Sequence, residues 1–312
     1  MAAQHGIDPN TSVTVAAVTD AAIIGAAGDL PPPGRRADAL RRALRHRSLS
    51  LGLVITAVLL LLVLSPALLH LPDPDLQDPA LAFSPPSAEH LMGADSFGRD
   101  MLSRVLYGGR TTMLASLCVV LIGAVVGTTL GLVAGTVRGP VGFAIMRLVD
   151  LLLAFPGILL ALAVAAVLGP GLLNGVIAIA AILTPVYARL VEGATSEVRN
   201  LPYVDAAVTL GAGPWRIMLR HVLPNVASGI IVLTTSWLGI AALWIAAHGF
   251  IGLGVQPPAA EWGAILNDGQ NYITVAWWIT VFPGLFLALF VVGVNLIGDG
   301  LRDETDPTLS RG

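Results

Sequence analysis

Long apolar runs separated by short polar segments dominate this chain. The first run, residues 49–71, carries no formal charge and is long enough to cross about 30 Å of hydrocarbon. Five more runs of comparable length follow it, so the pattern predicts an all-α bundle of six membrane-spanning helices. These five runs cover residues 111–137, 143–168, 172–188, 226–251 and 272–298.

The composition agrees with a surface that faces lipid. Of the 312 residues, 55% are hydrophobic and 12% are charged, and the mean hydropathy is +0.80. This charged fraction is about half of that in soluble domains, so it is too small to cover a core of this size against water. The net charge of −3 gives no reason to expect a nucleic acid partner.

The residue types also argue against several kinds of chemistry. All 17 basic residues are Arg, whereas a phosphate-binding loop of the GxxxxGK[ST] kind needs a Lys, so this chain is not expected to hydrolyse ATP itself. Cys118 is the one cysteine, and its place in an apolar run predicts a small buried residue. The histidines are scattered and form no HExxH pattern, so we expect neither a catalytic nor a metal site.

The positions of the arginines predict the orientation. Six arginines between residues 35 and 47 precede the first run, and cytoplasmic ends of spans carry an excess of Lys and Arg. With the N-terminus inside, fourteen arginines fall in cytoplasmic segments and three fall outside. We therefore expect a disordered cytoplasmic tail at 1–48, a first helix at 49–71, an extracytoplasmic segment at 72–110, a five-helix core at 111–300 and a cytoplasmic tail at 301–312.

A glycine stripe marks the second predicted span. Gly123, Gly127, Gly131 and Gly135 recur every four residues, so they share one helix face that another backbone can approach closely. Close packing is the default interpretation, and a face that slides or lines a pathway is the alternative. No charge lies at the midplane of any predicted span, which argues against proton or sodium coupling.

The cytoplasmic loop at 189–225 holds two short helix signals. Pro202 suits a first helical turn, and Asp205 places a carboxylate near the positive end of that helix. Gly211 can take the left-handed conformation that stops a helix, and Pro214 can open a second one. Such a pair predicts either a connector that lies on the lipid headgroups or a docking element for a cytoplasmic partner.

The same loop resembles the EAA loop of ABC importer permeases. The resemblance rests on residues 205–207, Gly211 and Leu223-Pro224, with Asp205 in place of the usual Glu and His221 in place of the usual Ile. In that family the short helix fits a cleft on an ATPase subunit and passes on its closure. The resemblance implies an ATPase-coupling role for Tyr203, Asp205, Ala206, Ala207, Gly211, Arg216, Arg220, His221, Leu223 and Pro224.

Further segments resemble the dipeptide/oligopeptide (peptide/nickel) branch of these permeases, and the second-permease (C-type) kind within it. Ile245 departs from the family pattern because a Glu is usual there, and His248 stands where an apolar residue is usual. A hydrogen-bonded structural role is the default interpretation of His248, and a gating role is the alternative. The resemblance covers about residues 45–310 and is carried by four segments, at 93–110, 187–190, 252–263 and 295–307.

The resemblance implies a type I ABC importer permease with six transmembrane helices and both termini in the cytoplasm. It implies a transport subunit of the cytoplasmic (inner) membrane, without chemistry or a cofactor of its own. Its partners would be a second homologous permease, two ABC ATPase subunits that bind ATP and Mg, and an extracytoplasmic solute-binding protein. A dipeptide or oligopeptide is the expected substrate. Nickel complexes, glutathione and haem are alternatives, and a secondary transporter or a membrane-embedded enzyme is more remote.

The outer segment holds the only arginines that we expect outside the membrane, mixed with acidic residues. Charged rims steer the encounter between partners. Asp95, Arg99, Asp100 and Arg104 are therefore candidates for contact with the solute-binding protein. The alternative is that Arg99 and Asp100 only tie this segment to the spans.

Overall fold

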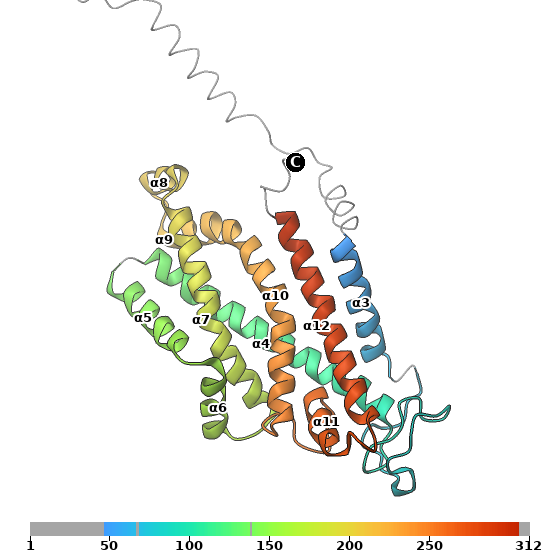
Figure 1. Ribbon diagram of the computed structural model, residues 1–312. Helices are drawn as coiled ribbons and strands as arrows, with labels where there is room; N and C mark the ends of the chain where they lie inside the picture. The colour runs from blue at the N-terminus through green and yellow to red at the C-terminus, as the bar shows by residue number, and fades with distance from the viewer. Residues whose placement is uncertain (1–46, 67–68, 138, 306–312) are drawn as a thin grey trace, which may run out of the picture. The chain divides into compact units, whose positions relative to one another are not determined.

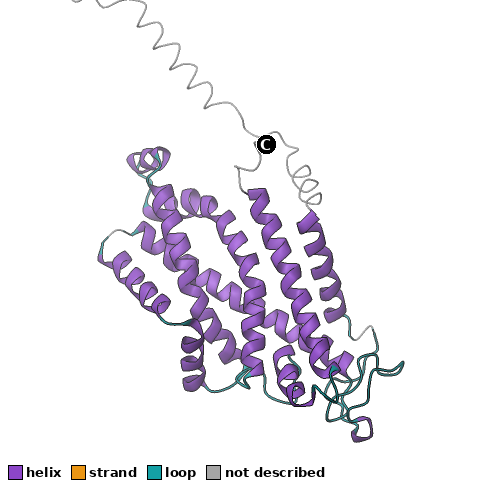
Figure 2. Ribbon diagram, in the orientation of Figure 1, coloured by secondary structure: helices purple, strands orange, loops and turns teal. Residues whose placement is uncertain are grey.

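The computed structural model describes residues 47–66, 69–137 and 139–305. Residues 1–46 of the predicted N-terminal tail and 306–312 of the predicted C-terminal tail lie outside this part of the chain. Every described element belongs to the unit Ala43–Gly312. The described residues form helices joined by loops, with one isolated bridge between Ala94 and Asp100 and no strand (Figure 2).

In the described part of the chain, five helices are long and apolar enough to cross a membrane. The first ends at Leu64 rather than at the predicted residue 71, because Pro66 disfavours a helical conformation in the residue before it. The second starts ten residues before its predicted span, where the Asp100 carboxylate accepts a hydrogen bond from the Ser103 N–H and caps the helix. The five are α3 (Arg47–Leu64), α4 (Met101–Thr136), α7 (Leu172–Arg199), α10 (Leu223–Phe250) and α12 (Trp278–Thr305).

The third predicted span, at 143–168, is broken into two helices. They are α5 (Pro140–Ala154) and α6 (Gly157–Leu168), and the chain bends by 97° between them. Phe155 is extended, with φ −84° and ψ 136°, because the residue before a proline avoids the helical region. A bent pair of this kind is either one broken span or a re-entrant loop.

The packing of α4 on α7 decides between these two possibilities. A Cβ on Gly127 would lie 2.4 Å from the Thr184 carbonyl oxygen, and one on Gly135 would lie 2.7 Å from the Thr195 Cβ. Residue numbers rise together along both helices, so α4 and α7 are parallel. The α5–α6 pair joins the end of α4 to the start of α7, so it must cross back over the same thickness. The bent pair therefore acts as one span, which gives six crossings.

These contacts also confirm the close-packing interpretation of the glycine stripe. Each of its four glycines would carry a Cβ within 3.1 Å of an α7 atom. Cys118 lies on α4 as well, but it is exposed, so the prediction that it is buried was wrong. Its neighbours Leu114, Leu117 and Leu121 are also exposed.

The two ends of the bundle carry different elements. At one end lie α8 (Pro202–Thr209) and α9 (Pro214–Ile217), and at the other lie α11 (Trp262–Gly269) and the loop segment that precedes α4 (Figure 1). The beginning of α3 and the end of α12 meet at the α8 end, where a Cβ on Gly300 would lie 2.7 Å from the Leu49 Cβ. The N-terminal end of α3 and the C-terminal end of α12 therefore lie on the same side of the membrane.

Candidate functional site

The loop that resembles the EAA loop folds as α8 and α9, joined by a tight turn. Gly211 has φ +84°, the left-handed conformation that glycine adopts readily. Its N–H donates to the Val208 carbonyl at 2.9 Å, and the Ala212 N–H donates to the Ala207 carbonyl at 3.0 Å. These two bonds satisfy the last carbonyl groups of α8. The predicted helix stop at Gly211 is confirmed.

One apolar side chain anchors α8 to the bundle. Val204 is 1% exposed and packs in a cluster with Leu132 of α4, Val191 of α7 and Ile217 of α9. The start of the loop is fixed separately, because Arg199 at the end of α7 donates to the carbonyl of Thr136. A cation at that position also complements the negative C-terminal end of α4. The loop is thus held at a defined position, with most of α8 facing solvent.

The loop exposes large apolar residues that the sequence analysis did not select. Leu210 is 88% exposed and Trp215 is 69% exposed, one on each side of the turn. Exposed apolar groups gathered on a polar loop indicate an interaction surface. In the sequence, this surface was indicated by the two large apolar residues that flank Gly211 and Gly213. Of the predicted residues, Ala207, His221 and Leu223 are partly buried, and the following are exposed: Tyr203, Asp205, Ala206, Gly211, Arg216, Arg220 and Pro224.

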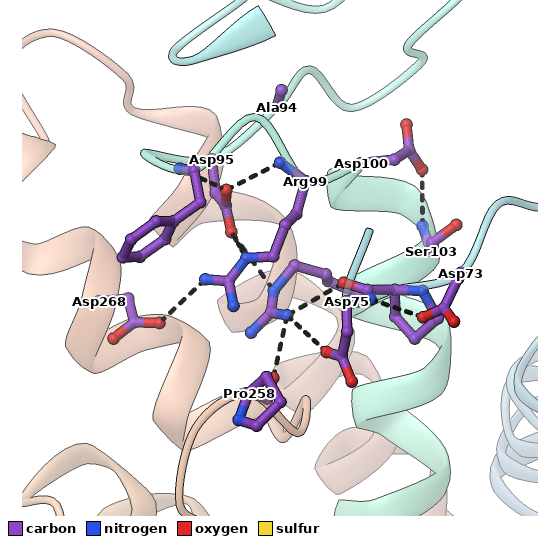
Figure 3. A network of polar contacts seen from close by, with 12 residues as sticks. Asp73, Asp75, Ala94, Asp95, Arg99, Asp100, Ser103, Pro258 and Asp268 are labelled. Atoms are coloured by element: carbon purple, nitrogen blue, oxygen red, sulfur yellow. Dashed lines mark hydrogen bonds and ion pairs between the residues drawn. The ribbon is translucent and has the colours of Figure 1, made fainter. Parts of the chain in front are cut away.

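An ion-pair network lies at the opposite end of the bundle (Figure 3). Its centre is the Asp95 carboxylate, which accepts a hydrogen bond from Arg99 Nε at 2.6 Å and further bonds from the Phe97 and Arg99 backbone N–H groups. Arg99 Nη2 lies 3.7 Å from the carboxylate of Asp268 on α11. The network therefore joins the outer loop segment to α11.

Arg104 extends this network from the first turn of α4. Its Nη1 donates to the carbonyl of Pro74 at 3.1 Å, to the carboxylate of Asp75 at 3.3 Å and to the carbonyl of Pro258 at 3.3 Å. Its Nε lies 3.5 Å from the Asp95 carboxylate. One guanidinium thus ties together two outer loops that are far apart in the sequence (Figure 3).

The four residues proposed for contact with a binding protein are interior groups. Asp95, Arg99, Asp100 and Arg104 are between 2% and 8% exposed. Arg99 and Arg104 both bind the Asp95 carboxylate, whereas the Asp100 carboxylate accepts from the Ser103 N–H and lies 3.0 Å from His90 Nδ1. This is the arrangement that the alternative interpretation predicted, in which charged groups tie the segment to the spans. Contact of these four residues with a binding protein stays a prediction.

Glu261 is a buried polar residue that the sequence analysis missed. It is 1% exposed and caps α11, accepting from the backbone N–H groups of Gly263 and Ala264 and from the Thr112 hydroxyl of α4. Burial raises the pKa of Glu261, because desolvation disfavours the charged form. A Cβ on Gly249 of α10 would lie 2.0 Å from its carboxylate. The sequence could have indicated this cap, because an acidic residue directly precedes the Trp-Gly pair at the start of α11.

His248, the predicted gating candidate, lies near the same end of α10. It is buried, and its Nδ1 lies 3.2 Å from the Trp244 carbonyl oxygen, one helical turn earlier. This contact fits the structural interpretation of His248, and a gating role stays a prediction. Ile245, which stands where a Glu is usual in similar permeases, is buried in the apolar core between α4, α7 and α10.

Comparison with known proteins places the chain among transport components. Residues 127–311 match the family described as "Binding-protein-dependent transport system inner membrane component". A glutathione transport system permease protein, GsiD of Pectobacterium atrosepticum, is 45% identical over 72% of this chain and 74% of its own length. A probable D,D-dipeptide transport system permease protein, DdpC of Escherichia coli, is 43% identical over 82% and 86%. A di/tripeptide transport system permease protein, DppC of Pseudomonas aeruginosa, is 45% identical over 76% and 80%.

The fold is similar to that of a solved transporter. A chain of the MetNI methionine ABC transporter, in a structure of its inward-facing conformations, matches with a TM-score of 0.53 and 20% identity. The match covers 66% of this chain and 98% of that chain, and it concerns the fold alone. It confirms the predicted helical permease fold of a type I ABC importer. From its matched region and its relatives, this multi-pass chain belongs to the family of inner membrane components of binding-protein-dependent transport systems.

Proposed function

We propose that this chain is a permease subunit of an ATP-driven ABC importer that moves dipeptides or oligopeptides across the inner membrane. The relatives named for di/tripeptide, D,D-dipeptide and glutathione transport support a peptide-like solute. All three names denote short peptides or peptide-like compounds. Nickel complexes, glutathione and haem are the alternatives, and uptake of a labelled dipeptide in competition with each of them would rank the four solutes.

The proposed assembly supplies what this chain lacks. Two ABC ATPase subunits bind ATP and Mg, and a second homologous permease completes the pathway. An extracytoplasmic solute-binding protein delivers the solute to the α11 end of the bundle. This chain itself carries no cofactor and performs no reaction. Both termini lie in the cytoplasm, as the arginine distribution indicates.

The observation that carries this proposal is the geometry of the α8–α9 loop. An eight-residue helix projects from the end of the bundle, and it is anchored by Val204 and stopped by Gly211. The small side chains of Ala206 and Ala207 allow it to sit deep in a cleft. Trp215 supplies an exposed aromatic anchor of the kind that dominates interface energetics, and Leu210 adds exposed apolar surface beside it. Closure of the ATPase subunits on the α8–α9 loop then shifts the membrane-spanning helices between two conformations.

Two neighbouring glycines give a matched test of the α8–α9 loop. A side chain at Gly211 or at Gly213 would meet nothing within 4 Å, but only Gly211 has positive φ. Gly211→Asp should therefore strain the turn by about 1 kcal/mol or more and misalign α8, whereas Gly213→Asp should not. In vesicles reconstituted with all purified subunits, Gly211→Asp should lose solute uptake while the chain stays in the membrane.

Normal uptake and normal stimulation of ATP hydrolysis in Gly211→Asp would contradict the proposal. Equal losses in Gly211→Asp and Gly213→Asp would show that added charge matters rather than the shape of the turn. A bulky substitution at Ala207 also tests how α8 fits its proposed cleft on the ATPase subunit, because Ala207 is partly buried on α8.

A further inference from the structure

The attachment of α8 to the bundle has one apolar and one polar component. The apolar component is the buried Val204. The polar component joins the first turn of α8 to the first turn of α10, because Asn225 Nδ2 donates to the Tyr203 hydroxyl at 3.1 Å. The Tyr203 ring also lies 5.9 Å from the His221 ring, measured between centroids. Apolar contacts have no preferred direction, so the Tyr203–Asn225 bond is the component that fixes how α8 is oriented on α10.

The covalent connection between α8 and α10 contains an irregular helical turn. Between α9 and α10 the backbone forms a π-helical turn at Met218–Val222. Such turns are rare and are frequently found at functional sites. Met218 and Leu219 also border an open apolar groove of about 660 Å³, which α4 lines with Thr128 and Leu132. Met218 and Val222 are buried in the same cluster as Val204, whereas Leu219 is exposed toward the groove. The connector therefore has one open side on which a push on α8 can deform it.

We infer that Tyr203 and Asn225 are positioning residues that transmit the displacement of α8 to α10, past the deformable π-helical connector. The inference rests on the proposed function, in which an ATPase subunit moves α8. Without the hydrogen bond, α8 still binds its partner through Leu210 and Trp215. The displacement is then absorbed by the connector, and less of it reaches the far end of α10.

Distance measurements at the far end test this directly. Spin labels at Leu173→Cys and Ile251→Cys, in a Cys118→Ala background, report on the outer ends of α7 and α10, and both sites are exposed. The complete transporter is measured in lipid before and after Mg·ATP with vanadate. In the unaltered chain a second distance should be populated. Tyr203→Phe removes only the hydroxyl and should reduce that population about two- to tenfold, as expected for one neutral hydrogen bond.

Three comparisons separate transmission from a merely structural role. Asn225→Leu should lose at least as much, because Asn225 Nδ2 also donates to the His221 carbonyl. The double variant should lose no more than Asn225→Leu alone, because both variants remove the Tyr203–Asn225 bond. Tyr272→Phe, at an exposed tyrosine near α11, is the matched control and should leave the distances unchanged. Thermal unfolding midpoints should be equal in all variants, whereas a structural role would lower them.

Unchanged populations in Tyr203→Phe, or losses that add in the double variant, would overturn the inference. If Gly211→Asp abolishes the ATP-induced distance while Tyr203→Phe leaves it intact, the inference fails and the proposed function stands. If Mg·ATP changes no distance in the unaltered chain, the proposed coupling and this inference fail together.

Discussion

At Glu261 a single carboxyl group meets three helices, and this has a consequence for pH. Because burial raises its pKa, the folded chain holds this proton more tightly than the unfolded chain does. The stability that comes from the neutral carboxyl is complete at low pH and is lost as pH rises through the folded pKa. The free energy of unfolding should therefore fall as pH rises above the ordinary pKa of a glutamate carboxyl toward the raised pKa of the folded chain.

Glu261→Gln keeps a side chain of the same shape but cannot titrate, so it should flatten this pH dependence. Tryptophan fluorescence during thermal unfolding of the purified chain measures the effect. Burial also raises the pKa of Asp268, against the opposing effect of Arg99, so Asp268→Asn is needed to separate the two contributions. An unchanged slope in Glu261→Gln would show that this carboxyl does not titrate in the range.

Arg104 illustrates a buried charge whose partners depend on it. Replacing it with Met leaves Asp95 with less compensation and removes the tie between the two outer loops. Breaking a buried pair from one side costs about 3–5 kcal/mol, so Arg104→Met should lower the unfolding temperature clearly. Arg110→Met is the control, since Arg110 lies one and a half turns further along α4 outside this network. If both variants unfold at the same temperature and only Arg104→Met slows capture of a binding protein, then Arg104 contributes to docking of that protein.

At the scale of elements, the glycine stripe sets how closely α4 and α7 approach. Gly127→Ala places a Cβ 2.4 Å from a backbone oxygen of α7, which no side-chain rotation relieves. The helices must move apart, and overpacking of this kind costs about 1–3 kcal/mol. Gly229→Ala on α10 is the matched control, because nothing lies within 4 Å of its added Cβ. The first variant should unfold at a lower temperature, and the second should equal or exceed the unaltered chain.

The break between α5 and α6 is an element-scale feature with a readable cause. Pro156 prevents Phe155 from joining the helix, so a run that looks like one span bends at that point. Its role as one crossing follows only from the helices on either side, which are parallel. Asp150 of α5 forms an ion pair with Arg189 of α7 and holds the bent segment to the bundle.

For the whole molecule, six crossings and the arginine distribution predict a cytoplasmic α8 and an outer face at α11. Cysteines introduced singly at Thr209, Ser87 and Gln256 test this in a Cys118→Ala background, and all three positions are exposed. A membrane-impermeant thiol reagent applied to intact cells should label Ser87→Cys and Gln256→Cys but not Thr209→Cys. Labelling of position 209 from outside would reverse the proposed orientation.

Local features of this chain could be predicted because their causes lie within a few residues. Apolar length indicated the spans, Gly211 marked the end of α8, and the four-residue glycine spacing marked a packing face. The motif resemblance pointed to the family that the comparisons show. Each of these depends on helix geometry or on the conformational range of one residue type, both of which are visible in the sequence.

Tertiary structure alone decided which polar groups are interior. Nothing local distinguishes Arg99 and Arg104, which are buried, from Arg216 and Arg220, which face solvent. The difference arises because groups from distant segments, at Asp75, Pro258 and Asp268, join the nearby Asp95 carboxylate around Arg99 and Arg104. A charge can be buried only where such partners meet it. Burial of Glu261 and the Tyr203–Asn225 bond have the same origin, since each depends on helices that the fold brings together.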